Sequence, residues 1–111
     1  MERLEMTIMV KQHKRLEFKQ TLDDLNEKLQ NLCTSLKVTE SENCLSYSII
    51  AQWKTAVKMQ EALKIEEFAI LSGAVKALCE NTIIKLNDKK VSNHISELGV
   101  LIEKQLKNLK K

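Results

Sequence analysis

Apolar residues recur along the first third of the chain at alternating steps of three and four. One register holds over five heptads, with nine of its eleven positions apolar: Met1, Leu4, Ile8, Lys11, Arg15, Phe18, Leu22, Leu25, Leu29, Leu32 and Leu36. Such a repeat is typical of a helix that packs along a seam against other helices. The sequence therefore predicts one long heptad-patterned helix over residues 1–37.

The next segment, residues 42–86, contains no residue that forces a helix to end. Thr39 and Glu42 fit a capping box, in which each side chain satisfies the other's free backbone amide. Two interpretations stay open. One is a continuous helix, kinked near Gly73, and it is favoured because no N-cap residue stands midway. The other is a pair of helices separated by a tight turn near Lys64.

Small residues and a polar turn complete the helical pattern. Ala69, Gly73 and Ala77 lie four residues apart, a spacing that lets a second helix approach closely. Asn87 or Asp88 would then cap a last helix over residues 90–110. This helix carries apolar residues at Val91, Ile95, Leu98, Ile102 and Leu109 in heptad phase.

The composition agrees with an all-α fold. The chain of 111 residues has no proline and only two glycines, whereas a sheet protein usually needs turn residues at each reversal. The expected architecture is an antiparallel helical bundle with coiled-coil-like packing, forming a single domain over 1–111. It has three long helices, or four if 42–86 divides.

The charge pattern changes this picture little. The net charge is +3, and Arg3 and Arg15 are the only arginines among 18 basic residues. Because arginine is the side chain best suited to phosphate and guanine, a nucleic-acid partner is not expected from this composition. A weaker alternative is a nucleic-acid-associated helical protein that uses the Lys-rich C-terminus, through Lys107, Lys110 and Lys111.

Cysteines and hydropathy indicate a compartment. Cys33, Cys44 and Cys79 form an odd set without a CxxC pair, which favours a reducing environment, cytoplasmic or nuclear. No window is long enough to span a membrane, and the most apolar stretch, 68–79, is short and contains Lys76. The N-terminus lacks the apolar core of a signal peptide.

Candidate chemistry is sparse. A zinc site of Cys33, Cys79 and His94 would lack the paired ligand spacing of structural sites. His13 would suit a histidine phosphotransfer bundle, but the Lys-Gly that typically follows such a histidine is absent. No serine or cysteine stands in a glycine-bearing turn that could supply oxyanion donors. The sequence therefore predicts no catalytic residue, no metal, no cofactor and no enzymatic activity.

The interaction surface is expected at the N-terminal end, where the long helix would overhang its shorter neighbours. Lys11 and Arg15 occupy seam positions there, and they either extend their charged ends to solvent or select an acidic partner. The predicted partner-binding residues are Met1, Leu4, Met6, Ile8, Met9, Lys11, Arg15 and Leu16. The function predicted from the sequence is a non-enzymatic protein–protein interaction module: a helical adaptor or assembly subunit that oligomerises or docks a helical partner.

Overall fold

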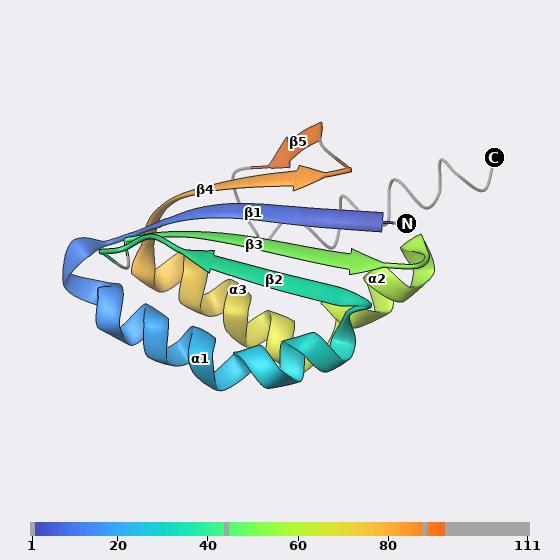
Figure 1. The fold of residues 1–111 in the computed structure, drawn as a ribbon, viewed down its shortest axis with the longest axis horizontal. Helices are drawn as coiled ribbons and strands as arrows, with labels where there is room; N and C mark the ends of the chain where they lie inside the picture. The colour runs from blue at the N-terminus through green and yellow to red at the C-terminus, as the bar shows by residue number, and fades with distance from the viewer. Residues whose placement is uncertain (1, 44, 88, 93–111) are drawn as a thin grey trace.

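A computed structural model describes residues 2–43, 45–87 and 89–92 and shows an α+β fold. All the α-helices of this part of the chain lie on one side of a single sheet (Figure 1). In chain order the elements are β1 (Glu2–Val10), a short 3-10 turn η1 (Gln12–Lys14), α1 (Arg15–Leu32), β2 (Ser35–Glu40), β3 (Ser46–Trp53), α2 (Ala56–Leu63), α3 (Glu66–Leu78), β4 (Cys79–Leu86) and β5 (Lys89–Ser92).

The sheet is antiparallel, with strand order β2-β3-β1-β4-β5. The first strand of the chain is therefore the central one, and Met6 faces Ile49 of β3 on one side and Ile84 of β4 on the other. With α2 and α3 taken together as one helical connection, β1 to β4 follow the βαββαβ order of ferredoxin-like folds. The short β5 adds an edge strand beside β4.

The long strands alternate between buried and more accessible residues, as expected for a sheet covered on one face. In β1 the residues that face the helices are Leu4, Met6, Ile8 and Val10. In β3 they are Tyr47, Ile49, Ala51 and Trp53. The residues between them point to the opposite face. The core therefore lies between the sheet and the three helices.

Helix α1 covers the sheet with one apolar stripe. Phe18, Leu22, Leu25 and Leu29 follow the i, i+4, i+7, i+11 spacing of one helix face, and all four are buried. The Phe18 ring packs against that of Tyr47 on β3, with ring centroids 5.1 Å apart. Burial of each such side chain contributes about 1.5–3 kcal/mol. This stripe joins the first helix to the sheet.

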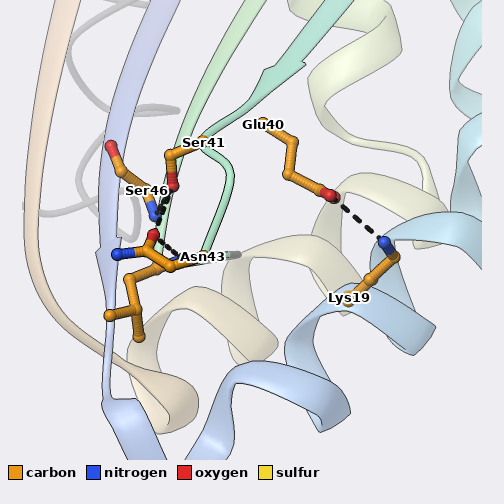
Figure 2. Close-up of polar contacts among 6 residues, drawn as sticks. Lys19, Glu40, Ser41, Asn43 and Ser46 are labelled. Atoms are coloured by element: carbon orange, nitrogen blue, oxygen red, sulfur yellow. Dashed lines mark hydrogen bonds and ion pairs between the residues drawn. The ribbon is translucent and has the colours of Figure 1, made fainter.

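The β2–β3 turn is made without glycine (Figure 2). The Ser41 hydroxyl donates to Asn43 Oδ1 over 2.8 Å, and the same amide oxygen accepts from the Leu45 backbone N–H at 3.1 Å. The Ser46 backbone N–H donates in turn to Ser41 Oγ at 3.0 Å. Asparagine and serine side chains here supply the hydrogen bonds that close the turn.

A second asparagine closes the β4–β5 turn. Asn87 has a φ of 51°, in the left-handed region where asparagine is among the better tolerated non-glycine residues. Its Oδ1 accepts from the Arg3 backbone N–H at 2.9 Å, and its own backbone N–H donates to the Arg3 carbonyl at 2.9 Å. Asn87 thus fastens the end of β4 to the start of the central strand.

The predicted all-α bundle with coiled-coil-like packing is wrong. The expected heptad helix over 1–37 is divided among β1, α1 and the start of β2. Its register from Phe18 to Leu29 does describe a real helix. At Leu4 and Ile8, however, a step of four residues is equally a multiple of the two-residue period of a strand. The heptad pattern therefore joined a strand, β1, and a helix, α1, into one predicted helix.

The expected helical segment 42–86 is also wrong, since it contains β3, α2, α3 and β4. The helical structure is interrupted at Lys64 and Ile65, between α2 and α3, which is where the two-helix interpretation placed a turn. Thr39, expected in a capping box, pairs with Ser48 inside the sheet. Of the expected helix 90–110, residues 90–92 belong to β5 and the rest lies outside the described residues.

The small-residue stripe does not mediate helix packing. Gly73 is exposed on α3, and a Cβ added there would meet no atom within 4 Å. Ala69 and Ala77 are exposed as well. A close helix approach at this face, expected from the sequence, is therefore absent from the described part of the chain.

No helix within residues 2–43, 45–87 and 89–92 is both long and apolar enough to cross a membrane.

Candidate functional site

An open cleft of about 360 Å³ lies at one end of the sheet, where α1 ends and α2 begins. This volume is within the range of small-molecule sites, about 300–1,000 Å³. Its walls come from three separate stretches of the chain and combine apolar and polar side chains. The lining residues are Asn31, Leu32, Cys33, Thr34, Trp53, Lys58, Glu61, Ala62 and Ile65.

Hydrogen bonds fix the walls of this cleft relative to one another. The indole N–H of Trp53 donates to the Leu32 carbonyl at 2.9 Å, which joins the last residue of β3 to the last residue of α1. The Thr34 backbone N–H donates to the Gln52 carbonyl at 2.8 Å. The cleft wall formed by α1 is therefore held to the sheet.

Helix α2 forms the opposite wall, and Thr55 sets where it starts. Thr55 Oγ1 accepts from the Lys58 backbone N–H at 3.2 Å, the usual bond of a threonine N-cap. Lys58 and Glu61 follow on the cleft side of α2, and Ala62 is buried beneath them. Ile65, the residue before α3, completes the rim.

Trp53 is the aromatic residue of the cleft lining. It is 2% exposed, and its ring centroid is 6.2 Å from that of Phe68 on α3. Because the ring is almost fully buried and its N–H is already bonded to Leu32, the indole offers the cleft neither an open ring face nor a free donor. Trp53 therefore positions the walls of the cleft relative to the core.

Cys33 lines the cleft without being a nucleophile. Burial raises the pKa of its thiol to about 11, so the group is protonated at neutral pH. Nucleophilic attack by cysteine requires the thiolate. Cys79, at the start of β4, resembles it in this respect: burial raises the pKa of that thiol to about 12, although the Lys11 charge acts in the opposite direction. Cys33 therefore contributes a polarisable apolar surface.

The structure separates the predicted partner-binding residues into two groups. Leu4, Met6 and Ile8 are 0% exposed in the core, so they pack within the chain itself. Met9 is 41% exposed on the opposite face of β1, and Leu16 is 71% exposed at the start of α1. Met1 lies outside the described residues. For the accessible members of the set, a role in partner binding stays a prediction.

Arg15 and Leu16 also line a shallow groove of about 420 Å³ with Gln12, His13 and Glu17. Its walls come from one continuous segment, so no side chains from separate elements converge on it. Lys11 lies at the edge of this region and donates to the Ala77 carbonyl at 3.5 Å. This groove is a weaker candidate site than the cleft.

The remaining chemical candidates from the sequence are not brought together. His13 lies exposed in the short turn η1 and not on a long bundle helix. Cys33 and Cys79 are free thiols on different elements, and His94 lies outside the described residues. Within residues 2–43, 45–87 and 89–92 there is no group of three His, Cys, Asp or Glu side chains that could hold a metal ion.

Sequence reasoning missed the cleft. Of its nine lining residues only Cys33 drew attention as a chemical group, and for a different reason. The cleft joins residues 31–34 to residue 53 and to residues 58–65, and no motif spacing links these segments. The available signal was the single tryptophan, followed by Thr55, a good N-cap residue, before a helical stretch.

The fold is shared with solved structures of small proteins. An antibiotic biosynthesis monooxygenase matches with a TM-score of 0.71 at 15% identity, over 79% of this chain and 97% of that one. A candidate antibiotic biosynthesis monooxygenase from Deinococcus radiodurans matches at 0.68 and 16%, over 83% and 95%. A conserved protein from Methanosarcina mazei matches at 0.68 and 20%, over 80% and 92%.

No protein-family model matches the sequence, and no curated protein matches it. At these identities, the structural similarity establishes a common fold. It overturns the predicted non-enzymatic helical adaptor, because that prediction required a helical bundle and the described residues form an α+β fold. The histidine phosphotransfer bundle and the nucleic-acid-binding helical protein are wrong for the same reason. The prediction of no enzymatic activity rested on the absence of a catalytic motif from the sequence, and the fold shared with solved antibiotic biosynthesis monooxygenases contradicts it.

Proposed function

We propose that this protein is a small enzyme of the monooxygenase type that binds its substrate in the cleft beside Trp53. The main observation in support of this proposal is a ligand-sized cleft with mixed apolar and polar walls, on a fold shared with antibiotic biosynthesis monooxygenases. A monooxygenase transfers one atom of dioxygen to its substrate and reduces the other to water, with two electrons from the substrate or from a reductant. Lys58 and Glu61, both exposed on the cleft wall, would contact the substrate.

Binding can be followed directly, because Trp53 is the only tryptophan of the chain. We expect planar hydroxylated or amino-substituted aromatic compounds to quench its emission. Compounds that bind and can be oxidised should then support dioxygen uptake, measured with and without a supplied reductant. Transfer of label from isotopic dioxygen into the product identifies the reaction as oxygenation.

A pair of threonine variants tests whether the cleft is the site. Thr34→Tyr places a ring in the cleft from an exposed position, and we expect at least about a tenfold loss of affinity and of oxygen uptake. Thr39→Tyr, exposed on β2 outside the cleft, is the matched control and should retain both. Oxygen uptake unaffected by Thr34→Tyr would contradict the proposal, as would a panel that gives neither quenching nor uptake.

Self-association, predicted from the sequence, has a more suitable surface on the open face of the sheet. In one row across this face Lys37, Ile50, Glu5 and Lys85 stand side by side. Two copies packed face to face about a twofold axis would bring each Glu5 near lysines of the other copy, with Ile50 between them. The exposed Met9 belongs to the same face.

We expect the full chain to have twice the 12.8 kDa monomer mass in light scattering. Thr7→Lys, at the exposed centre of the open face, should shift the protein to monomer because it buries an extra charge. Gln20→Lys on the exposed side of α1 should leave the mass unchanged. A monomer at all concentrations would contradict self-association. Cys33 and Cys79, the free thiols within the described residues, fit a reducing compartment, cytoplasmic or nuclear, as part of this proposal.

A further inference from the structure

Helix α3 is apolar on both of its faces. One face is buried in the core through Phe68, Leu71 and Val75. The opposite face is exposed, and between Glu66 and Lys76 at its two ends it carries only small or apolar residues: Ala69, Ile70, Gly73 and Ala77. From Gln20 onward the exposed residues of α1 are, by contrast, all polar or charged. Because a helix that is apolar all round is normally covered all round, the outer face of α3 needs a partner.

The shape of this outer face suits a helix. Ala69, Gly73 and Ala77 form a row with steps of four residues, and Ile70 beside them is 46% exposed. A Cβ added at Gly73 would meet no atom within 4 Å. The space above the row is therefore open in the described part of the chain. A helix that lies there can come close to the α3 backbone, because the side chains between them are small.

Residues 93–111, which lie outside the described residues, have a sequence that fits this face. Their large apolar residues follow one another at steps of three and four: Ile95, Leu98, Ile102, Leu106 and Leu109. This spacing places all five on one side of a helix. The chain also exceeds the fold that it shares, since two of the solved structures match over 95% and 97% of their own length but over 83% and 79% of this chain.

The direction of the chain leads toward the same face. Strand β5 ends at Ser92 and pairs antiparallel with β4, so it runs back toward the start of β4 (Figure 1). That start is Cys79, the residue directly after α3. A helix that begins near there and covers α3 runs broadly antiparallel to it. Its basic end, with Lys107, Lys110 and Lys111, then approaches the start of α3, where Glu66 and Glu67 lie.

We propose that residues 95–109 form a helix that packs on the outer face of α3 within the same chain. Two rows with the same step of four residues then meet: Leu98, Ile102 and Leu106 against Ala77, Gly73 and Ala69. Rows of this spacing pack into one another in the commonest class of helix contact. Ile102 lies over Gly73 at the centre, where a large side chain meets the smallest residue of the row.

Hydrogen exchange of the full chain tests this contact. A helix as short as 95–109 is marginal in water by itself, so slow exchange of its backbone amides requires packing. We expect the amides of residues 98–109 to exchange at least about tenfold more slowly than those of a synthetic peptide of residues 93–111. Exchange at the rate of the peptide would overturn the proposal.

Gly73→Glu shows whether this protection comes from α3. Glutamate is a better helix former than glycine, and the added Cβ meets no atom, so the change does not damage α3 itself. It does place a carboxylate against Ile102, and we expect residues 98–109 to exchange at the rate of the peptide. Gln20→Glu, exposed on α1, should leave the protection unchanged. Protection that survives Gly73→Glu would place the segment elsewhere and contradict the proposal.

A disulfide tests the register and shows which chain supplies the segment. Gly73→Cys combined with Ile102→Cys should form, under mild oxidation, a bond between positions 73 and 102 of one chain, identified by peptide mapping at the monomer mass. Gly73→Cys combined with Lys104→Cys, on the opposite side of the helix, should not. The parent chain, oxidised in parallel, gives the background from its own cysteines. Absence of the first bond, equal bonding in both variants, or a 73–102 bond found only between two chains would each overturn the proposal.

Discussion

Replacing Ile8 with alanine is expected to lower the free energy of unfolding by about 2–5 kcal/mol. Ile8 is 0% exposed at the centre of the sheet, opposite Tyr47 of β3 and Thr82 of β4. Its removal leaves a cavity between the sheet and the helices, where neighbouring strands cannot readily move inward. Urea denaturation of the variant and the parent chain measures the difference.

Met9→Ala is the control for this prediction. Met9 is the next residue on the same strand but points to the opposite face, at 41% exposure. Its replacement should change the free energy of unfolding by no more than about 0.5 kcal/mol. Equal losses for the two variants would contradict the strand assignment, since only a strand places adjacent residues on opposite faces.

Trp53→Ala is expected to cost about 3–5 kcal/mol, the usual range for a buried tryptophan. This change removes the contact with Phe68 and also leaves the Leu32 carbonyl without its donor. It therefore separates the end of α1 from the end of β3 as well as opening the core. Because the fluorophore is lost, unfolding must be followed by circular dichroism.

Trp53→Phe divides these two contributions. Phenylalanine keeps an aromatic ring near Phe68 but cannot donate to the Leu32 carbonyl, so we expect a smaller loss of about 1–2 kcal/mol. Lys54→Ala, at the exposed neighbouring position, should have little effect. A loss for Trp53→Phe as large as for Trp53→Ala would mean that the hydrogen bond, rather than the packing, dominates.

The sequence pattern predicted α1 correctly over its buried stripe. Phe18, Leu22, Leu25 and Leu29 have a spacing that fits a helix and not a strand, because steps of three alternate with steps of four. The same register failed on either side of this stripe. Leu4 and Ile8 are four residues apart, which fits both periods, and the apolar Met6 and Val10 between and after them indicate a strand.

The same two-residue alternation occurs in β3 and was missed there too. Tyr47, Ile49, Ala51 and Trp53 alternate with accessible residues, among them Ser46 and Ser48. The apolar Ile50 interrupts the pattern on the open face and makes the segment resemble a two-faced helix. Strand pairing is set by partners far away in sequence, so the local pattern alone left the choice open.

Scarcity of glycine and proline was the second source of error. It argued against a sheet protein, yet Ser41 and Asn43 close one turn between strands and Asn87 closes another in the left-handed conformation. Both asparagines were visible in the sequence as turn residues. The cleft could not be predicted in the same way, because its walls meet only after β2 pairs with β3 and α2 folds back.

The position of β1 in the sheet has a consequence for how the chain folds as it is made. Of the described strands, β1 is synthesised before the others and lies at the centre of the sheet, and its partner β4 ends at Leu86. At about 5–20 residues per second, one edge of β1 stays unpaired for several seconds after its own synthesis. During that interval Leu4, Met6, Ile8 and Val10 form an apolar row beside an open strand edge, an arrangement prone to aggregation. We therefore expect this protein to need protection during translation more than a chain whose first strand lies at a sheet edge.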